Sequence, residues 1–181
     1  MGGTVPYNRW SLDLSAVNPL TNNTISIRQG TIDDAELIAR FNINMARETE
    51  SMALDPEVIT NGGKTLIQSP DMGFYLVAEA NDEIVGSLMV TTEWSDWRNG
   101  KFWWIQSVYV IETFRRKGVY NRLYSRVKEM GESAGNICGY RLYVEKENTV
   151  AQSTYRKLGM SETCYDMYEE MVADWHYTLK T

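Results

Sequence analysis

Runs of alternating or continuous apolar residues predict the strands of a mixed α/β domain. These runs are rich in β-branched and aromatic residues and lie at 25–28, 74–78, 84–90, 102–110, 140–144 and 163–172. Apolar residues at helical spacing predict helices over about 31–45, from 56 through 59, and over 118–133 and 148–158. The resulting order, β-α-α-β-β-β-α-β-α-β, predicts strands and helices layered around one core.

The expected organisation is a single domain over residues 25–181, preceded by a polar, irregular N-terminal arm over residues 1–24. The length of 181 residues and the apolar content of 43% suit one globular domain. A net charge of −6 argues against nucleic acid as the main partner and is compatible with a cationic substrate. No apolar run approaches membrane-spanning length and no signal peptide opens the chain, so we expect a cytoplasmic protein without a membrane partner.

Metal and nucleophile chemistry have little support in the residue types present. The chain has two cysteines, Cys138 and Cys164, and one histidine, His176. A zinc site needs several such ligands at defined spacing, so no metal is predicted. One histidine near the C-terminus also argues against a Ser-His-Asp or Cys-His system. We expect the two cysteines to be buried free thiols in a reducing compartment.

Residues 108–120 form the most informative segment. A predicted strand ends, a short loop carries three cations (Arg115, Arg116 and Lys117), and Gly118 opens a predicted helix. A helix N-terminus offers unpaired N–H groups and partial positive charge, and glycine allows close approach of a phosphate. The segment lacks the glycines of a Walker loop or a dinucleotide fingerprint. It is interpreted either as a pyrophosphate site or as a solvated basic turn before an ordinary helix.

Two motifs resemble those of the GCN5-related N-acetyltransferase (GNAT) superfamily. Val108-x-Val110 followed by Arg115-x-x-Gly118-x-Tyr120 is similar to its motif A, with Tyr120 where the family has a small residue. Downstream, residues 148–160 resemble its motif B, N-x-x-A-x-x-x-Y-x-K-x-G-F, with Met160 in place of Phe. The resemblance covers residues 25–172. It implies a mixed central sheet of six to seven strands, with about four helices on both faces.

The resemblance also implies acetyl-CoA as the acyl donor. In the family, the strand of motif A contacts the pantetheine arm and the loop amides hold the pyrophosphate. The residues expected to bind the donor are Val108, Tyr109, Val110, Arg115, Arg116, Lys117, Gly118, Val119, Tyr120, Asn148 and Ala151. Tyr155 corresponds to the family's general acid, which protonates the departing thiolate. Its alternative interpretation is a packing aromatic with an anchored hydroxyl.

The group that takes the proton of the acceptor amine is less evident. Relatives such as the diamine acetyltransferases have a glutamate where this chain has Gln106, and glutamine cannot accept a proton at neutral pH. The proton is expected to leave through water or to another acid, with Glu48, Glu50 and Glu93 as candidates that could equally be solvated surface carboxylates. Glu48, Trp104 and Gln106 are expected on the acceptor side. Strand alternation predicts that Trp104, Gln106 and Val108 share one face.

Four tryptophans gather near one predicted hairpin: Trp94, Trp97, Trp103 and Trp104. They are expected to pack the sheet or a subunit interface, such as that of a homodimer, or to form an aromatic wall for an organic cation. The leading hypothesis is an acetyl-CoA-dependent N-acetyltransferase acting by direct attack of a primary amine, on a small molecule or a lysine side chain. The alternatives are a catalytically silent acyl-CoA-binding regulatory module, a protein-interaction module using the tryptophan-rich hairpin, and transfer of a longer acyl group.

Overall fold

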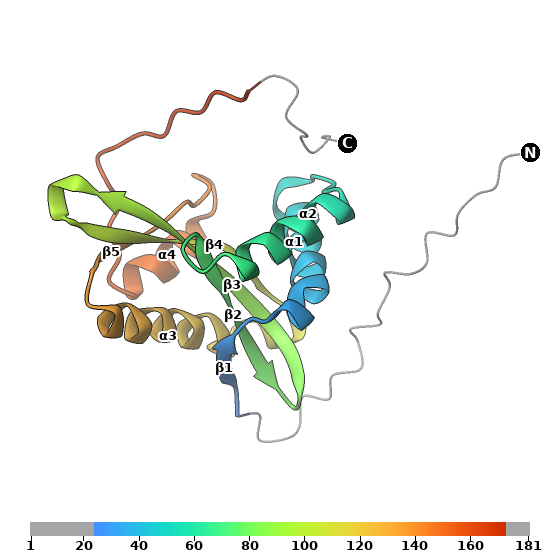
Figure 1. Ribbon diagram of the computed structural model, residues 1–181. Helices are drawn as coiled ribbons and strands as arrows, with labels where there is room; N and C mark the ends of the chain where they lie inside the picture. The colour runs from blue at the N-terminus through green and yellow to red at the C-terminus, as the bar shows by residue number, and fades with distance from the viewer. Residues whose placement is uncertain (1–23, 173–181) are drawn as a thin grey trace, which may run out of the picture.

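The computed structural model describes residues 24–172, and most of the predicted N-terminal arm therefore lies outside the described residues. The described chain forms one five-stranded sheet with four α-helices, in the strand order β1-β2-β3-β4-β5 (Figure 1). The strands are β1 (Ser26–Gln29), β2 (Gly73–Ala80), β3 (Glu83–Ser95), β4 (Gly100–Val110) and β5 (Ile137–Leu142). The helices are α1 (Ala35–Glu50), α2 (Pro56–Gln68), α3 (Val119–Ala134) and α4 (Thr149–Lys157). Neighbouring strands are antiparallel except β4 and β5, which are parallel, so the predicted mixed sheet is confirmed.

The prediction of six to seven strands is wrong for the described residues. Residues 163–172 alternate like a strand but contain no strand in the structure, and Figure 1 shows this segment leaving α4 without joining the sheet. Several of its large side chains stay in solvent, with Tyr168 92% exposed. A strand needs a partner ladder and a buried face, and here the alternating pattern has neither.

The two faces of the sheet are covered by different helices. Tyr75 and Val77 of β2 pack with Ile38 of α1 and Leu66 of α2. The residues of β2 that point the other way pack with Leu123 and Val127 of α3, which lies on the opposite side of the sheet in Figure 1. The alternation along β2 thus sorts the core into an α1/α2 layer and an α3 layer. These layers hold the end of β4 between them.

A β-bulge in β4 changes which residues face the α1/α2 layer. Tyr109 pairs with Ser87 and Gln106 pairs with Met89, so two residues of β4 stand opposite Leu88 alone. Ser107 takes the left-handed backbone conformation, with φ 48°. An extra residue reverses the side-chain alternation beyond it. Tyr109 therefore joins Gln106 on the α1/α2 face.

The predicted face of Val108 is consequently wrong. Trp104 and Gln106 share a face, as expected, because their partners Thr91 and Met89 are two residues apart on β3. Beyond the bulge Tyr109 takes the place predicted for Val108, and its ring lies 5.2 Å from that of Phe41 in α1. Alternation counted on a regular strand cannot anticipate this reversal.

Strands β4 and β5 separate close to the bulge in β4. Their parallel ladder ends at the pair Ile105–Leu142, and the rest of β4 has no strand partner on that side in the described part of the chain. Backbone N–H and C=O groups on such an edge need other partners, which a bound ligand can supply. A short connection, which includes the 3-10 turn Glu112–Phe114, joins this open edge to the start of α3.

An ion pair ties β1 to the start of the first helix. Arg28 donates from both terminal nitrogens to the buried carboxylate of Asp34, at 2.7 and 2.9 Å. The N–H and hydroxyl of Thr31 donate to the same carboxylate at 2.7 and 3.1 Å. The hydrogen bond from Arg28, supported by Thr31, holds the pKa of Asp34 below its usual value although burial acts in the opposite direction.

Asp34→Asn is expected to lower the free energy of unfolding by about 1–3 kcal/mol at pH 7, because it removes a charge-assisted acceptor. The folded pKa is depressed, so the stabilisation is present above the unfolded pKa and is lost as pH falls through the folded value. Urea unfolding at pH 7 and pH 3 measures this, and the difference between the proteins should shrink at pH 3. An equal difference at both pH values would contradict an ionic contribution.

Some residue-level features also differ from expectation. Cys138 and Cys164 are both exposed free thiols rather than buried ones, because β5 is an edge strand and Cys164 lies in the irregular segment after α4. Within residues 24–172 there is no group of three or more potential metal-ligating His, Cys, Asp or Glu side chains. None of the helices described has both the length and the apolar character needed to cross a membrane.

Candidate active site

The start of α3 is an open, uncapped helix N-terminus. Gly118 is the N-cap residue with φ 79°, and no side chain caps this helix among the described residues. A Cβ placed on Gly118 would meet no atom within 4 Å. The first N–H groups of a helix have no intrahelical partner and carry partial positive charge. This position suits an anionic group such as a phosphate.

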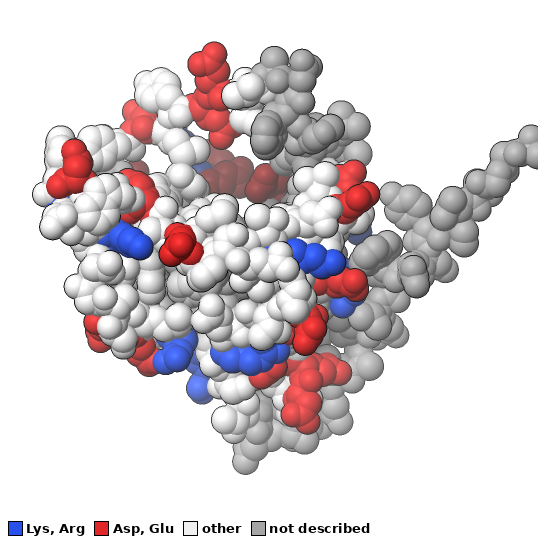
Figure 2. Space-filling view, in the orientation of Figure 1, with Lys and Arg blue, Asp and Glu red and all other residues white. Residues whose placement is uncertain are grey.

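The three cations before Gly118 do not act alike. Arg115 turns toward α1, where its terminal nitrogen lies 2.5 Å from a carboxylate oxygen of Glu48, and its Nε donates to the Val110 carbonyl at 2.9 Å. The Lys117 ammonium lies over the Phe114 ring, 5.1 Å from its centroid. The side chain of Arg115, one of the residues expected to bind the donor, is therefore engaged with Glu48 and the Val110 carbonyl in this structure. Figure 2 shows Lys and Arg side chains interleaved with acidic ones on the face it displays.

Tyr120, the bulky residue at the family's small position, packs against other tyrosines. Its ring stacks on Tyr124 at 6.1 Å and meets the edge of Tyr155 at 5.8 Å. The side chain thus lies against α4 and the next turn of α3. Its hydroxyl is buried and has no hydrogen-bond partner among the described residues, and burial strongly raises its pKa. A buried hydroxyl of this kind is costly unless a further group satisfies it.

Tyr155 is held by a short, capped helix. The Asn148 side chain accepts a hydrogen bond from the Ala151 N–H at 3.0 Å, which fixes the start of α4. Asn148 and Ala151, both expected to contact the donor, are thus engaged with each other in this structure. Burial raises the pKa of Tyr155, so its phenol is protonated at neutral pH and is available as a proton donor.

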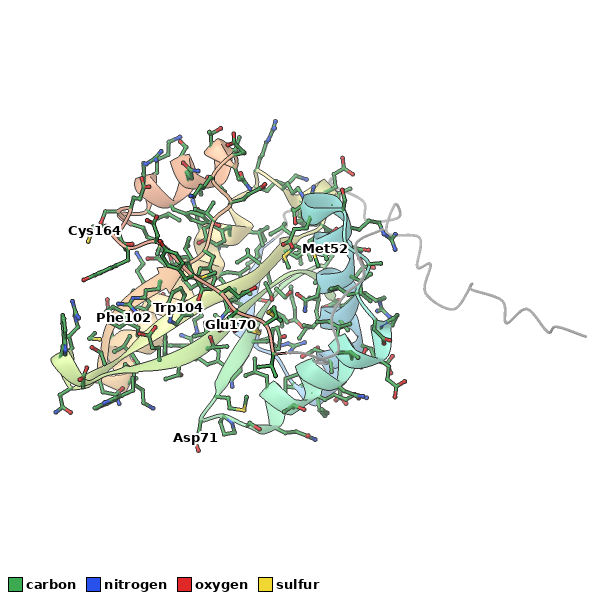
Figure 3. The ribbon with its side chains drawn as sticks, turned by 90° about the horizontal axis from the view of Figure 1, so that it is seen from above. Met52, Asp71, Phe102, Trp104, Cys164 and Glu170 are labelled. Atoms are coloured by element: carbon green, nitrogen blue, oxygen red, sulfur yellow. The ribbon has the colours of Figure 1, made fainter. Side chains whose placement is uncertain are left out.

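The face of β4 that carries Trp104 is polar and aromatic. Gln106 donates to the Thr91 hydroxyl at 2.6 Å, and the Trp104 indole donates to Glu93. Phe102 and Trp104 project from this same face (Figure 3). The sequence did not single out two residues at the end of β5 and directly after it, Arg141 and Tyr143. The pairing of β4 with β5, which is distant in sequence, places these residues here. No local sequence pattern predicts that pairing.

Arg141 and Tyr143 complete this cluster. Arg141 donates to both oxygens of Glu93, at 2.7 and 3.0 Å, and lies 3.7 Å from the centroid of the Phe102 ring. Tyr143 stacks on Trp104 at 4.5 Å. Glu93, one of the candidate proton acceptors, is therefore occupied by a guanidinium and an indole.

Glu48 lies in a second, separate polar cluster at the end of β4. The Tyr109 hydroxyl donates to one oxygen of Glu48 at 2.8 Å, while Arg115 holds the other. Glu48 and Tyr109 line an open cavity of about 430 Å³. The other residues that line it are Asn44, Arg47, Ile111, Glu112 and Thr113. Burial, with the Glu48 carboxylate beside it, raises the pKa of Tyr109. Glu50, the last residue of α1, is exposed and does not line this cavity.

A family model described as the acetyltransferase (GNAT) family matches residues 39–160, a span that includes the bulge, the start of α3 and Tyr155. The chain belongs to this acetyltransferase family. The resemblance stated from the two sequence motifs is thereby confirmed, and the chain is an N-acetyltransferase.

Individual relatives agree with this assignment. The chain is 28% identical over 155 residues to the uncharacterized N-acetyltransferase YhfO of Bacillus subtilis (strain 168), covering 86% of this chain and 97% of that protein. The crystal structure of a possible acetyltransferase from Clostridium difficile 630 has a TM-score of 0.77 and 49% identity, covering 82% of this chain and 97% of that one. The aminoglycoside N-acetyltransferase AAC(6')-Iy in complex with CoA has a TM-score of 0.68 and 17% identity, covering 84% and 97%, and shows the shared fold.

The tryptophans of this acetyltransferase do not form one wall. Trp103 is buried and meets the edge of Phe74 at 5.2 Å, whereas Trp104 stands on the opposite face of β4. Trp94 and Trp97 lie at the hairpin end of β3 and are 57% and 85% exposed. The four therefore do not form one aromatic wall, because adjacent strand residues point to opposite faces, and buried Trp103 packs the sheet as the other interpretation expected.

Proposed function

We propose that this acetyltransferase moves the acetyl group of acetyl-CoA to a primary amine on a small molecule or a lysine side chain. One observation carries the proposal: among the described residues β4 has no strand partner on its outer side beyond Ile105, and a short connection with the 3-10 turn Glu112–Phe114 then leads to the uncapped start of α3 at Gly118. An extended amide-containing arm followed by a pyrophosphate would find backbone partners along the edge and N–H donors at the helix. The complex of AAC(6')-Iy with CoA supports a CoA donor in this fold.

The donor site would rely on backbone groups more than on side chains. Val108 and Val110 would offer the strand edge, although the Val110 carbonyl already accepts from Arg115 Nε, and residues 116–120 would offer the amides of the helix start. Tyr120 is compatible with this role because its ring packs against Tyr124 and Tyr155. Backbone donation does not depend on the size of the side chain, so the departure from the family's small residue is tolerated.

Acetyl transfer from a thioester to an amine needs few catalytic groups. A neutral amine attacks the thioester carbonyl, and the departing thiolate is stabilised by a proton. Tyr155 would supply that proton, because its phenol is protonated at neutral pH and sits against Tyr120 in the first turn of α3. Acetyl-CoA bound at the proposed edge would supply the acetyl group itself.

Acetyl-CoA is expected to raise the melting temperature of the protein more than ATP or NAD does. Ligand at 100 times its Kd adds about 2.7 kcal/mol to the stability of the native state. A thermal-shift titration measures this effect, and equal shifts with ATP would indicate a generic anion site instead.

The transferase activity itself is tested with a panel of amines and polyamines, using release of free thiol as the readout. We expect thiol release with at least one amine above the hydrolysis observed without acceptor. Donor binding with no thiol release for any amine would favour the silent acyl-CoA-binding module over the enzyme.

A further inference from the structure

The Tyr109 hydroxyl and the Glu48 carboxylate are already joined by a hydrogen bond in the wall of an open cavity. Tyr109 donates to Glu48 at 2.8 Å, and both residues line the cavity of about 430 Å³. The Tyr109 ring is buried against Phe41, which fixes the direction of its hydroxyl. Arg115 holds the other oxygen of Glu48 at 2.5 Å. A phenol and a carboxylate fixed in this way form a preassembled path for one proton.

The surroundings of this pair suit an ammonium group. Glu48 and Glu112 bring carboxylates to the cavity, and Arg47 is the cation among its lining residues. Arg115 and Asn44 are the other charged or polar groups that interact with Tyr109. Ile111 and the tyrosine ring add apolar surface for the carbon chain of an amine. The lining thus combines two carboxylates, one guanidinium and apolar surface around the phenol.

The bulge in β4 places this pair where the missing base is needed. Gln106 cannot accept a proton and is hydrogen-bonded to Thr91. Because Ser107 is the extra residue, Tyr109 lies on the same face as Gln106 and three residues along the strand. The backbone of Tyr109 belongs to the edge proposed for the donor, while its side chain points to the cavity. One residue therefore connects the donor edge to the cavity.

We propose that Tyr109 and Glu48 form a proton relay that deprotonates the acceptor ammonium in this cavity. The proposal rests on the proposed function. Tyr109 is the catalytic residue, because its phenol oxygen touches the amine. Glu48 acts through Tyr109 as a positioning residue and as the final site of the proton.

The acceptor enters as an ammonium ion and loses two protons in all. One N–H bond of the ammonium breaks and its proton joins the Tyr109 oxygen, while the tyrosine's own proton moves to Glu48. The freed lone pair forms the bond from nitrogen to the acetyl carbon, and the C–S bond breaks. Tyr155 gives its proton to the sulfur. The second proton on nitrogen restores Tyr155 through solvent, and Glu48 releases its proton to solvent through the open cavity.

The test compares the pH dependence of kcat, with any accepted amine at saturation, for the wild type, Tyr109→Phe and Glu48→Gln. Wild-type kcat should be flat across neutral pH, because the relay deprotonates bound ammonium. Each variant should lose at least about tenfold in kcat at pH 7, since a positioned base is replaced by water. In both variants kcat should rise with pH toward the amine's own pKa, about 10.4 for a lysine-like amine.

Glu50→Gln is the matched control, because it removes a carboxylate two residues away on the same helix that does not line the cavity. It should retain the wild-type profile. The KM for acetyl-CoA and the thermal shift caused by acetyl-CoA should be unchanged in all variants, which separates a proton-transfer role from loss of folding or donor binding.

Two outcomes would overturn the relay alone. One is a flat, wild-type profile in Glu48→Gln or Tyr109→Phe. The other is a rising profile produced by Glu50→Gln rather than by the relay variants. Wild-type protein that releases no thiol with any amine would overturn the proposed function, and the relay with it.

Discussion

Replacing Gly118 with aspartate is expected to weaken coenzyme A binding by about 100-fold or more without unfolding the protein. A Cβ at this position meets no atom within 4 Å, so the side chain has room. The φ of 79° is unfavourable for most residues, but aspartate tolerates it better than most. Its carboxylate would stand where the proposed pyrophosphate binds. Two like charges about 4 Å apart repel by about 4 kcal/mol at a surface-like dielectric constant, more than a 100-fold loss requires.

Gly135→Asp provides the control at the other end of the same helix. Gly135 also has a left-handed backbone, with φ 71°, and its side of the helix is equally open. A negative charge there opposes the helix dipole and costs about 0.3–1 kcal/mol, but lies away from the cradle. Calorimetric titration with coenzyme A should show a large loss only for Gly118→Asp. Equal losses in both variants would attribute the effect to the stability of α3, and unchanged affinity in Gly118→Asp would remove this helix start from the donor site.

Features set by neighbouring residues were predictable from the sequence. A helix was predicted from residue 56, and α2 begins there, at Pro56, behind Asp55, whose carboxylate accepts from the N–H groups of Glu57 and Val58. Gly118 was expected to open α3, and it is the N-cap residue of that helix. Such signals work because a helix end is satisfied by groups within a few residues of it.

Features that depend on pairing between distant segments were not predictable. The bulge at Ser107 follows from the register of β4 against β3, and serine gives no local sign of a left-handed backbone. It reverses the faces of Val108 and Tyr109, and so brings the tyrosine to the face of Gln106 and the α1/α2 layer. Arg115 was expected to face a phosphate, but its partner Glu48 lies 67 residues away in the chain. A pattern within one segment contains no information about such partners.

The strand expected at 163–172 shows that a local pattern alone also cannot establish that a strand forms. The alternation is present in the sequence, yet the segment joins no ladder and leaves Tyr165 and Tyr168 largely exposed. Alternation states which side chains would share a face if a strand formed. Whether a strand forms depends on an available edge and a surface to bury, which the segment itself does not provide.

Tyr155→Phe is expected to lower kcat by about 100-fold, the lower end of the usual contribution of general acid catalysis. The substitution keeps the ring, and with it the edge contact to Tyr120 at 5.8 Å, and removes only the hydroxyl. Burial raises the pKa of this phenol, so almost every molecule of the wild type carries the proton at neutral pH. The lower end applies because a thiolate is already a tolerable leaving group. Steady-state kinetics with an accepted amine measures the change.

Tyr124→Phe is the control for loss of a buried hydroxyl near the same site. The Tyr124 ring stacks on the Tyr120 ring, and the Tyr155 ring makes an edge contact with the same Tyr120 ring. No role in acetyl transfer is assigned to Tyr124. Its kcat should match that of the wild type. In Tyr155→Phe the loss should fall on kcat, with coenzyme A affinity little changed, because the missing proton matters only as the C–S bond breaks. Wild-type turnover in Tyr155→Phe would show that Tyr155 only packs and is not the general acid. The thiolate would then leave unprotonated or take its proton from water.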